Sequence, residues 1–243
     1  MKTYYYDIID STNEEAIRHF KRGEAGDLLF VADRQEAGRG RRGRSFYSTA
    51  GGGIYFSFLL QGIRSYEIGE LLTPVAGACV ATCLRSFGVD AGIKWVNDIF
   101  VKGKKVCGIL AEACQDEDGK LAAVVLGIGI NLSTEDFPEE LRGIAGSLSE
   151  FHLPKKQILE RISGDILLAT ESIRMGGREA VLPYMRQYRN YSIVIGQKIN
   201  CVDGNGNTKP AYVDTIDDDG ALCVTYEDGT RDTIKSGEVS VRF

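Results

Sequence analysis

Histidine is nearly absent from this sequence, which has only His19 and His152 among its 243 residues. With so few imidazoles, the sequence favours neither a zinc site nor catalysis by a histidine base or nucleophile. None of the six cysteines forms a CxxC pair, so a thiol-based metal site has no support either. Any chemistry is therefore expected to depend on other side chains.

Long apolar segments are also missing. The first residues contain no apolar core of signal-peptide length, and no apolar run approaches the ~18 residues of a membrane span. Several cysteines lie inside shorter apolar stretches, which is typical of buried, reduced thiols. These observations predict a cytoplasmic protein with no membrane partner.

Positive charge is in deficit overall. The 29 lysines and arginines are outnumbered by 34 aspartates and glutamates, which gives a formal net charge of −5. Domains that hold duplex DNA by general electrostatics are usually basic, so this class of function is disfavoured. Against that acidic background, residues 38–44 consist of four arginines and three glycines.

This arginine segment predicts a flexible loop, because each glycine would cost ~0.5–1 kcal/mol inside a helix or strand. Arginine forks bind the paired oxygens of phosphates and carboxylates. The segment directly follows a stretch predicted as a buried strand, so it can overhang a pocket and close on an anionic ligand. The run alone leaves open a solvated basic turn or a localisation signal.

Apolar periodicity predicts the remaining elements. A short helix begins near Ser11, with Thr12 and Glu15 at capping-box spacing. Strands are predicted at 27–33, 54–60, 93–95, 99–101, 106–113 and 121–131, and helices at 67–87, 155–174 and 178–188. Lys102-Gly103 and Asp118-Gly119 are typical of hairpin turns.

The pattern changes after Tyr191. Short strands then alternate with turns at 204–206, 219–220 and 228–229, and no long helical period remains. Five strands in about 50 residues are typical of a small β-barrel. The sequence therefore predicts two domains, residues 1–190 and 191–243.

Polar residues in two segments are candidates for binding a ligand. Lys94 lies between apolar residues of a short strand, and a buried ammonium is unfavourable unless it meets an anion. It could stabilise charge on a transferring phosphate, pair with Asp98, or reach the surface. At the first helix, Ser11, Thr12 and Asn13 could bind a polar ligand or simply cap the helix.

Glycines interrupt two of the apolar strands. Gly127 and Gly129 precede Asn131, and residues 108–112 show a similar pattern on the neighbouring hairpin. Glycine within a strand indicates close approach of another backbone or of a ligand, with simple packing as the alternative.

Taken in order, these segments resemble the biotin protein ligases along nearly the whole chain. The matching motifs are residues 10–13, 35–44 with the GRGRRG sequence, 94–98, 108–112, 127–131 and 237–242. The resemblance implies an α+β fold. Its parts are a mixed β-sheet catalytic domain of the class II synthetase and biotinyl/lipoyl ligase type with packed helices, and a small C-terminal SH3-like β-barrel.

The resemblance also implies the site. Biotin would be bound by Ser11, Thr12, Asn13, Gln35, Arg39, Gly40, Arg41 and Lys94. ATP would be bound by Arg41, Arg44, Phe46, Lys94 and Asn131. Lys94 and Arg41 are the implied catalytic residues, and no metal ligand is identified. Phe46 stands where the family often has Trp, and Val96 where it commonly has Pro, so stacking and the strand exit are in doubt.

The implied reaction is an ATP-dependent, AMP-forming ligation with Mg²⁺. Biotin is first activated as biotinyl-5′-AMP, with release of pyrophosphate. A lysine of a biotin carboxyl carrier protein domain, of the acetyl-CoA carboxylase type, then attacks the mixed anhydride. Because two anions must approach each other in the first step, cationic side chains are physically required. The resemblance is to members without an N-terminal DNA-binding domain, so we expect no direct DNA binding; a homodimer is left open.

Two other functions compete with this interpretation. A lipoate or octanoate ligase or transferase of the same superfamily is the nearest, because residues 51–53 form a similar glycine stretch. The arginine segment favours biotin instead. A nucleic-acid-binding module is the second alternative, but the acidic chain opposes it and Lys94 would remain unexplained.

Overall fold

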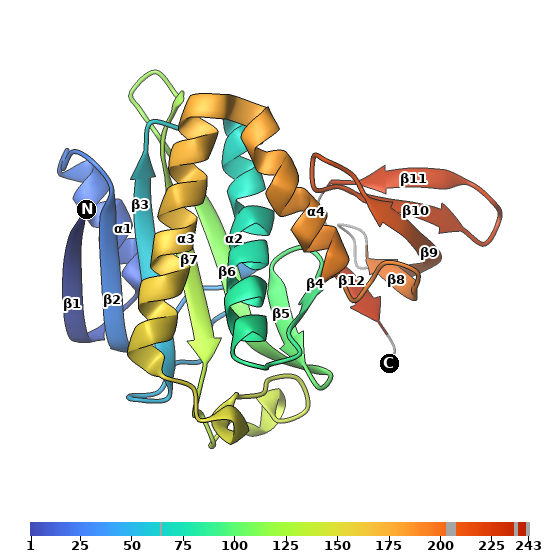
Figure 1. Cartoon of the computed structure of the whole chain (residues 1–243), viewed down its shortest axis with the longest axis horizontal. Helices are drawn as coiled ribbons and strands as arrows, with labels where there is room; N and C mark the ends of the chain where they lie inside the picture. Colours follow the sequence, from blue (N-terminus) through green and yellow to red (C-terminus); the bar gives the residue numbers. More distant parts are fainter. Residues whose placement is uncertain (64, 203–207, 236–237, 242–243) are drawn as a thin grey trace.

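The computed structural model describes residues 1–63, 65–202, 208–235 and 238–241. Its larger part is a seven-stranded sheet in the order β1-β2-β3-β7-β6-β5-β4 (Figure 1). The strands are β1 (Lys2–Ile9), β2 (Leu28–Gln35), β3 (Gly53–Gln61), β4 (Gly92–Lys94), β5 (Asp98–Val101), β6 (Lys104–Gln115) and β7 (Leu121–Asn131). Only the β1–β2 pair is parallel, so the sheet is mixed, as the α+β fold class requires.

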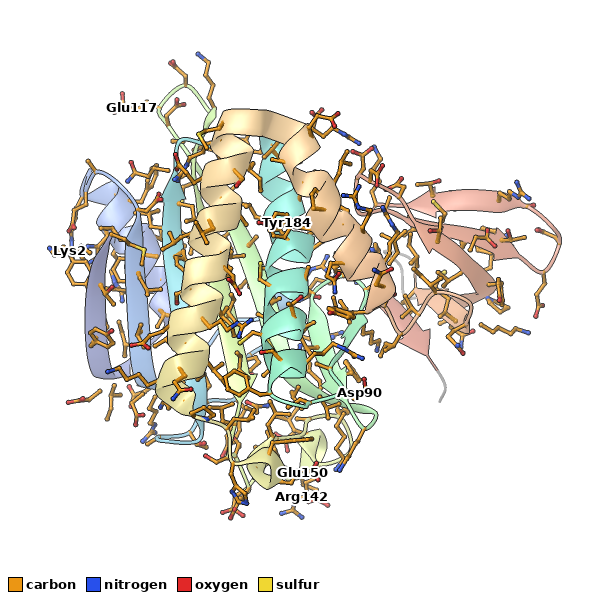
Figure 2. All side chains as sticks on the ribbon, viewed as in Figure 1. Lys2, Asp90, Glu117, Arg142, Glu150 and Tyr184 are labelled. Carbon is orange, nitrogen blue, oxygen red and sulfur yellow. The ribbon has the colours of Figure 1, made fainter. Side chains whose placement is uncertain are left out.

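Helices cover the two faces of this sheet unequally (Figure 1). The helices are α1 (Thr12–Lys21), α2 (Tyr66–Ser86), α3 (Lys155–Gly176) and α4 (Leu182–Asn190). Helices α2 and α3 lie side by side across one face, with α4 beside them, and α1 packs on the opposite face. Figure 2 shows side chains filling the helical layer, where Tyr184 of α4 packs against the larger core.

Strand β3 explains why an uninterrupted apolar run is stable here. Alternate side chains point to opposite faces of a sheet. Ile54, Phe56, Phe58 and Leu60 belong to the core beneath α2 and α3, whereas Leu59 belongs to a second core beneath α1. Burial on both faces therefore selects apolar residues at successive positions.

The predicted elements are confirmed with small shifts of their ends, except that the helix predicted at 178–188 begins as a 3₁₀ turn (Gly177–Val181) ahead of α4. One strand was missed. Strand β1 lies at the sheet edge, and Tyr5 and Ile8 are 73% and 56% exposed. Its mixed burial explains why no clean alternation marks it in the sequence. By length and hydropathy α2 alone, among the described helices, is long and apolar enough to cross a membrane, yet 72% of its apolar window is buried in this core.

A second sheet follows in the C-terminal part (Figure 1). It is antiparallel, in the order β11-β10-β9-β8-β12. Its strands are β8 (Lys198–Val202), β9 (Thr208–Ile216), β10 (Leu222–Tyr226), β11 (Arg231–Ile234) and β12 (Glu238–Val241). The predicted count of five strands is confirmed, while the turn at 204–206 lies outside the described residues. The domain boundary at 190/191 stays a prediction.

Candidate functional site

A narrow pocket opens on the α1 face of the large sheet. Its lining includes Ser11, Thr12, Asn13, Gln35, Arg39 and Gly40, together with Gly127 and Gly129 of β7. The start of α1, the end of β2 and the middle of β7 therefore meet at one place, although they are far apart in the chain. The parallel β1–β2 pair, which sets Ile9 opposite Gln35, brings the first two of these segments together.

A chain of hydrogen bonds supports this pocket from below. The Thr12 hydroxyl donates to Gln35 Oε1 at 3.1 Å and lies 2.7 Å from Ser57 Oγ. Ser57 donates to Asn13 Oδ1 at 2.6 Å, and Asn13 Nδ2 donates to Glu112 at 2.7 Å. Ser57 is fully buried and Thr12 and Asn13 are almost so, which fixes the orientation of the Asn13 amide.

These bonds also correct the capping-box prediction. Helix α1 has Ser11 as its N-cap residue, with no hydrogen bond from a side chain at that cap. Thr12 instead directs its hydroxyl to Gln35 and Ser57, because the neighbouring strands offer buried polar partners. The short polar residues at this helix start therefore form part of the pocket.

The strand glycines make room for side chains of the pocket. A methyl group at Gly127 would collide with the Asn13 amide, and one at Gly129 would lie 2.6 Å from the Phe46 ring. At Gly108 a methyl group would be 3.2 Å from the same ring. Side chains rather than a backbone approach these glycines, as in the packing alternative.

The arginine segment forms a compact turn. Arg39 and Ser45 form an antiparallel bridge, and Gly40 N–H donates to Arg44 O at 2.7 Å. Between them Arg41–Gly43 forms a short 3₁₀ turn in which Arg42 has a φ of 56°. The segment is a loop, as predicted, and the bridge and the 3₁₀ turn give it local order. The glycines still permit the positive φ of 73° at Gly43.

Two arginines of this turn contact opposite walls. Arg39 forms an ion pair with Glu112 of β6 at 2.9 Å and another with Glu14 of α1. Arg41 Nη1 donates to Asn97 Oδ1 at 3.4 Å. The turn thus spans from helix α1 and strand β6 to the segment that follows Lys94.

A second, wider cavity adjoins the first. It has a volume of about 480 Å³ and is lined by Arg41, Arg44, Phe46, Lys94, Lys105 and Asn131. Gly40, Arg41, Phe46, Asn97 and Lys105 line both pockets. One wall is apolar and comes from Phe137, Leu141 and Ile144. This wall belongs to the segment of Arg142 and Glu150, which lies beyond the end of the sheet in Figure 2.

Lys94 lines the second cavity and not the first. Its ammonium lies 5.1 Å from the centre of the Phe100 ring. Asp98, which lines the same cavity, forms an ion pair with Lys105 at 2.6 Å. Lys105 was missed in the sequence, where it is one of two adjacent lysines after a turn. The buried neighbours Val106 and Cys107 are the signal that this lysine lies on an inner strand.

Asn131 ends strand β7 inside the second cavity. Its amide nitrogen donates to Gly146 O at 3.1 Å, and the residue is 4% exposed. Its Oδ1 is buried with no hydrogen-bond partner among the described residues. A buried acceptor of this kind fits a hydrated cation or a donor group of a ligand. Within those same residues, no group of three or more His, Cys, Asp or Glu side chains is arranged to hold a metal ion.

The first pocket is too small for a ligand as it stands. Its volume is about 40 Å³, against roughly 300–1,000 Å³ for most ligand sites. Phe46 and the arginine turn form one of its sides, so their displacement is the simplest way to enlarge it. Every residue expected at the site thus lines one of the two pockets, but the division of roles among them stays a prediction.

Comparison with known proteins finds two family models that match different parts of the chain. The biotin/lipoate A/B protein ligase family matches residues 5–131, and the biotin protein ligase C-terminal domain matches residues 194–242. The bifunctional ligase/repressor BirA of Bacillus spizizenii is 33% identical over 230 residues, which is 93% of this chain and 70% of that protein.

A second relative and a solved structure agree with this result. The biotin–[acetyl-CoA-carboxylase] ligase of Mycobacterium tuberculosis is 30% identical over 94% of this chain and 85% of its own length. The biotin protein ligase of Aquifex aeolicus, in complex with biotin and ATP, superimposes with a TM-score of 0.82 at 25% identity. That match covers 99% of this chain and 98% of the other.

Proposed function

The chain belongs to the biotin/lipoate A/B protein ligase family as a biotin protein ligase, and we propose that its two adjoining pockets divide the reaction between biotin and ATP. The narrow pocket receives biotin, and the wider cavity receives ATP. The product of the first step is biotinyl-5′-AMP, and the second step transfers the biotinyl group to a lysine of a carrier protein domain.

The observation that carries this division is the chemistry of the two linings. The narrow pocket offers hydroxyl and amide groups from Ser11, Thr12, Asn13 and Gln35, which suit a neutral ureido ring. The wider cavity has cationic side chains and one apolar wall, which suit a triphosphate and a purine; the cations include Arg41, Arg44, Lys94 and Lys105. The shared residues lie where the two reacting groups must meet.

The reaction needs the negative charges of both substrates to be screened. A biotin carboxylate oxygen attacks the α-phosphorus of ATP, the bond to the β-phosphate oxygen breaks, and pyrophosphate leaves. Arg41 and Lys105, which line both pockets, would neutralise the approaching carboxylate and the equatorial phosphate oxygens. Lys94 and Arg44 would hold the phosphates from the nucleotide side. No protein nucleophile takes part in this step.

Mg²⁺ would enter with ATP as part of the substrate. A magnesium ion usually keeps several waters and is held mainly by phosphates and one or two protein oxygens. The unpartnered Oδ1 of Asn131 and the nearby Asp98 are oxygen ligands of this kind. The metal would withdraw charge from the phosphate oxygens. In this proposal the protein contributes few ligands because the triphosphate contributes most of them.

The carrier lysine needs its own path to the adenylate. A third groove, of about 470 Å³, shares Arg41, Ile109 and Leu110 with the biotin pocket. It also contains the carboxylates Glu70, Glu112 and Asp219, which would attract a lysine side chain. The amine attacks the anhydride carbonyl, the amide forms, and AMP leaves with its bond to the acyl carbon broken.

A pyrophosphate-exchange assay tests this function directly. Purified protein should exchange labelled pyrophosphate into ATP when biotin is present and not when lipoate replaces it. Exchange with lipoate alone would overturn the assignment. Lys94→Ala should lose exchange while it retains the wild-type melting temperature, and Lys102→Ala is the matched control because that exposed lysine pairs with Glu150. Equal loss in both variants would contradict the role of Lys94.

The cellular setting follows as part of the proposal. All six cysteines are free thiols, and five of them are buried. Burial raises the pKa of Cys79 to about 12, so this thiol is unreactive near neutral pH. Such thiols suit a reducing cytoplasm.

A further inference from the structure

We propose that Trp95 is a positioning residue through which the C-terminal sheet aligns the nucleotide cavity. Trp95 is 4% exposed, and its indole Nε1 donates to Gly220 O at 2.8 Å. Gly220 lies in the β9–β10 turn of the second sheet, 125 residues further along the chain. This inference rests on the assignment of the wider cavity to ATP.

The acceptor of this hydrogen bond is held in place by its own turn and by helix α4. Asp217 Oδ1 accepts from the backbone N–H groups of Asp219 and Ala221, at 2.9 and 2.8 Å. Arg189 of α4 donates to Ile216 O at 3.1 Å and pairs with Asp218 at 2.8 Å. The turn therefore presents the Gly220 carbonyl in one orientation to the catalytic domain.

The segment that follows Trp95 is fixed from two other sides. The Tyr188 hydroxyl of α4 donates to Val96 O at 2.9 Å. Burial raises the pKa of Tyr188 above its ordinary value, so the phenol keeps the proton that it donates. Asn97 exchanges hydrogen bonds with Ile109 of β6, with Asn97 Nδ2 donating to Ile109 O at 2.7 Å.

What these contacts align is part of the nucleotide cavity. Lys94 and Trp95 both line that cavity, with the indole N–H directed to Gly220, and Asn97 lines both pockets. Asn97 also accepts a hydrogen bond from Arg41. The polar groups of the biotin pocket, in contrast, are held by α1, β2 and β3. Loss of the indole N–H should therefore disturb ATP more than biotin.

The test is Trp95→Phe, which keeps an aromatic ring and removes the N–H donor. We expect the KM for ATP in biotin-dependent exchange to rise about tenfold, with the KM for biotin within twofold of wild type. Arg178→Gln is the matched control, because Arg178 pairs with Asp219 of the same turn at the surface. It should leave both constants unchanged.

A second variant covers the case in which Trp95→Phe does not fold. Tyr188→Phe removes the hydroxyl from the other side of the segment, and Tyr188 lines neither pocket. It should raise the KM for ATP severalfold and spare the KM for biotin. An unchanged KM for ATP in a folded Trp95→Phe variant, or in Tyr188→Phe if Trp95→Phe does not fold, would overturn the inference. Equal increases in the KM for ATP and the KM for biotin would also overturn it. A wild-type protein without biotin-dependent exchange would instead overturn the proposed function.

Discussion

Removal of the Ser57 hydroxyl is the sharpest test of how the biotin pocket is held. Ser57 is fully buried on β3, and its Oγ is shared by Thr12 and Asn13. It lies beneath the pocket and is not part of its lining, so Ser57→Ala takes no direct contact from a ligand. Any change in biotin binding must then be transmitted through Thr12 and Asn13.

The magnitude follows from what each partner loses. In Ser57→Ala, Thr12 Oγ1 keeps its bond to Gln35, whereas Asn13 Oδ1 loses the donor at 2.6 Å. An unsatisfied buried acceptor costs about 1–3 kcal/mol, which lowers the melting temperature of a protein of this size by roughly 2–12 °C. If the freed amide forfeits about 1–2 kcal/mol of biotin binding, the dissociation constant rises about 5- to 30-fold.

Calorimetric titration with biotin and thermal unfolding separate the two effects. Thr170→Val is the control, because Thr170 is also fully buried but donates only to Ile166 O of its own helix. It should lose stability with no change in biotin affinity. A folded Ser57→Ala that binds biotin within twofold of wild type would refute the reasoning, because the network would then not orient the pocket.

Three other expectations can be checked with standard assays. Gly129→Ala should weaken biotin binding about tenfold in calorimetry, because the new methyl group displaces the Phe46 ring; unchanged affinity would mean that the ring is free to move. Lys105→Ala should slow adenylate formation in a single-turnover assay by about 10²-fold or more, and a near-wild-type rate would exclude it from catalysis. The hydrogen bond from Arg18 lowers the pKa of Asp10 below its usual value of 3.8, so the ionised carboxylate stabilises the fold. Asp10→Asn should remove this stabilisation, which is under ~1 kcal/mol because both groups are exposed. The difference in stability between wild type and variant should be full above pH 3.8 and vanish as the pH falls through the lowered pKa of Asp10. An equal difference at pH 2 and pH 7 in thermal melts would contradict this.

The sequence predicted the parts of the site that depend on composition. The arginine turn, the polar start of α1 and the strand glycines are each unusual enough to be noticed locally. Their convergence on one pocket is now explained by sheet order, because β2, β3 and β7 are neighbours. Strand β1 was missed because its edge position gives a burial pattern without a clear period, so its sequence carries no local signal.

Residues whose role depends on long-range pairing could not be predicted. Ser57 looks like one polar interruption of an apolar strand, and only its contact with Asn13 reveals its role. Glu112 is one of many acidic residues until the fold sets it beside Arg39. Lys105 was likewise not identified, because it follows another lysine and the sequence alone does not indicate which side chain faces the cavity.

The two-faced packing of β3 has a consequence for how this chain can vary. Shifting one residue within a strand moves every side chain to the other face. A single deletion in β3 would turn Phe56 or Phe58 toward the pocket and bury Ser57 beneath the helices. Length changes should therefore be excluded from this strand and confined to the turns that flank it, such as the exposed glycine at position 51. Homologous enzymes should therefore differ within β3 by substitution only. Insertions and deletions between the arginine turn and β7 should fall in the loops.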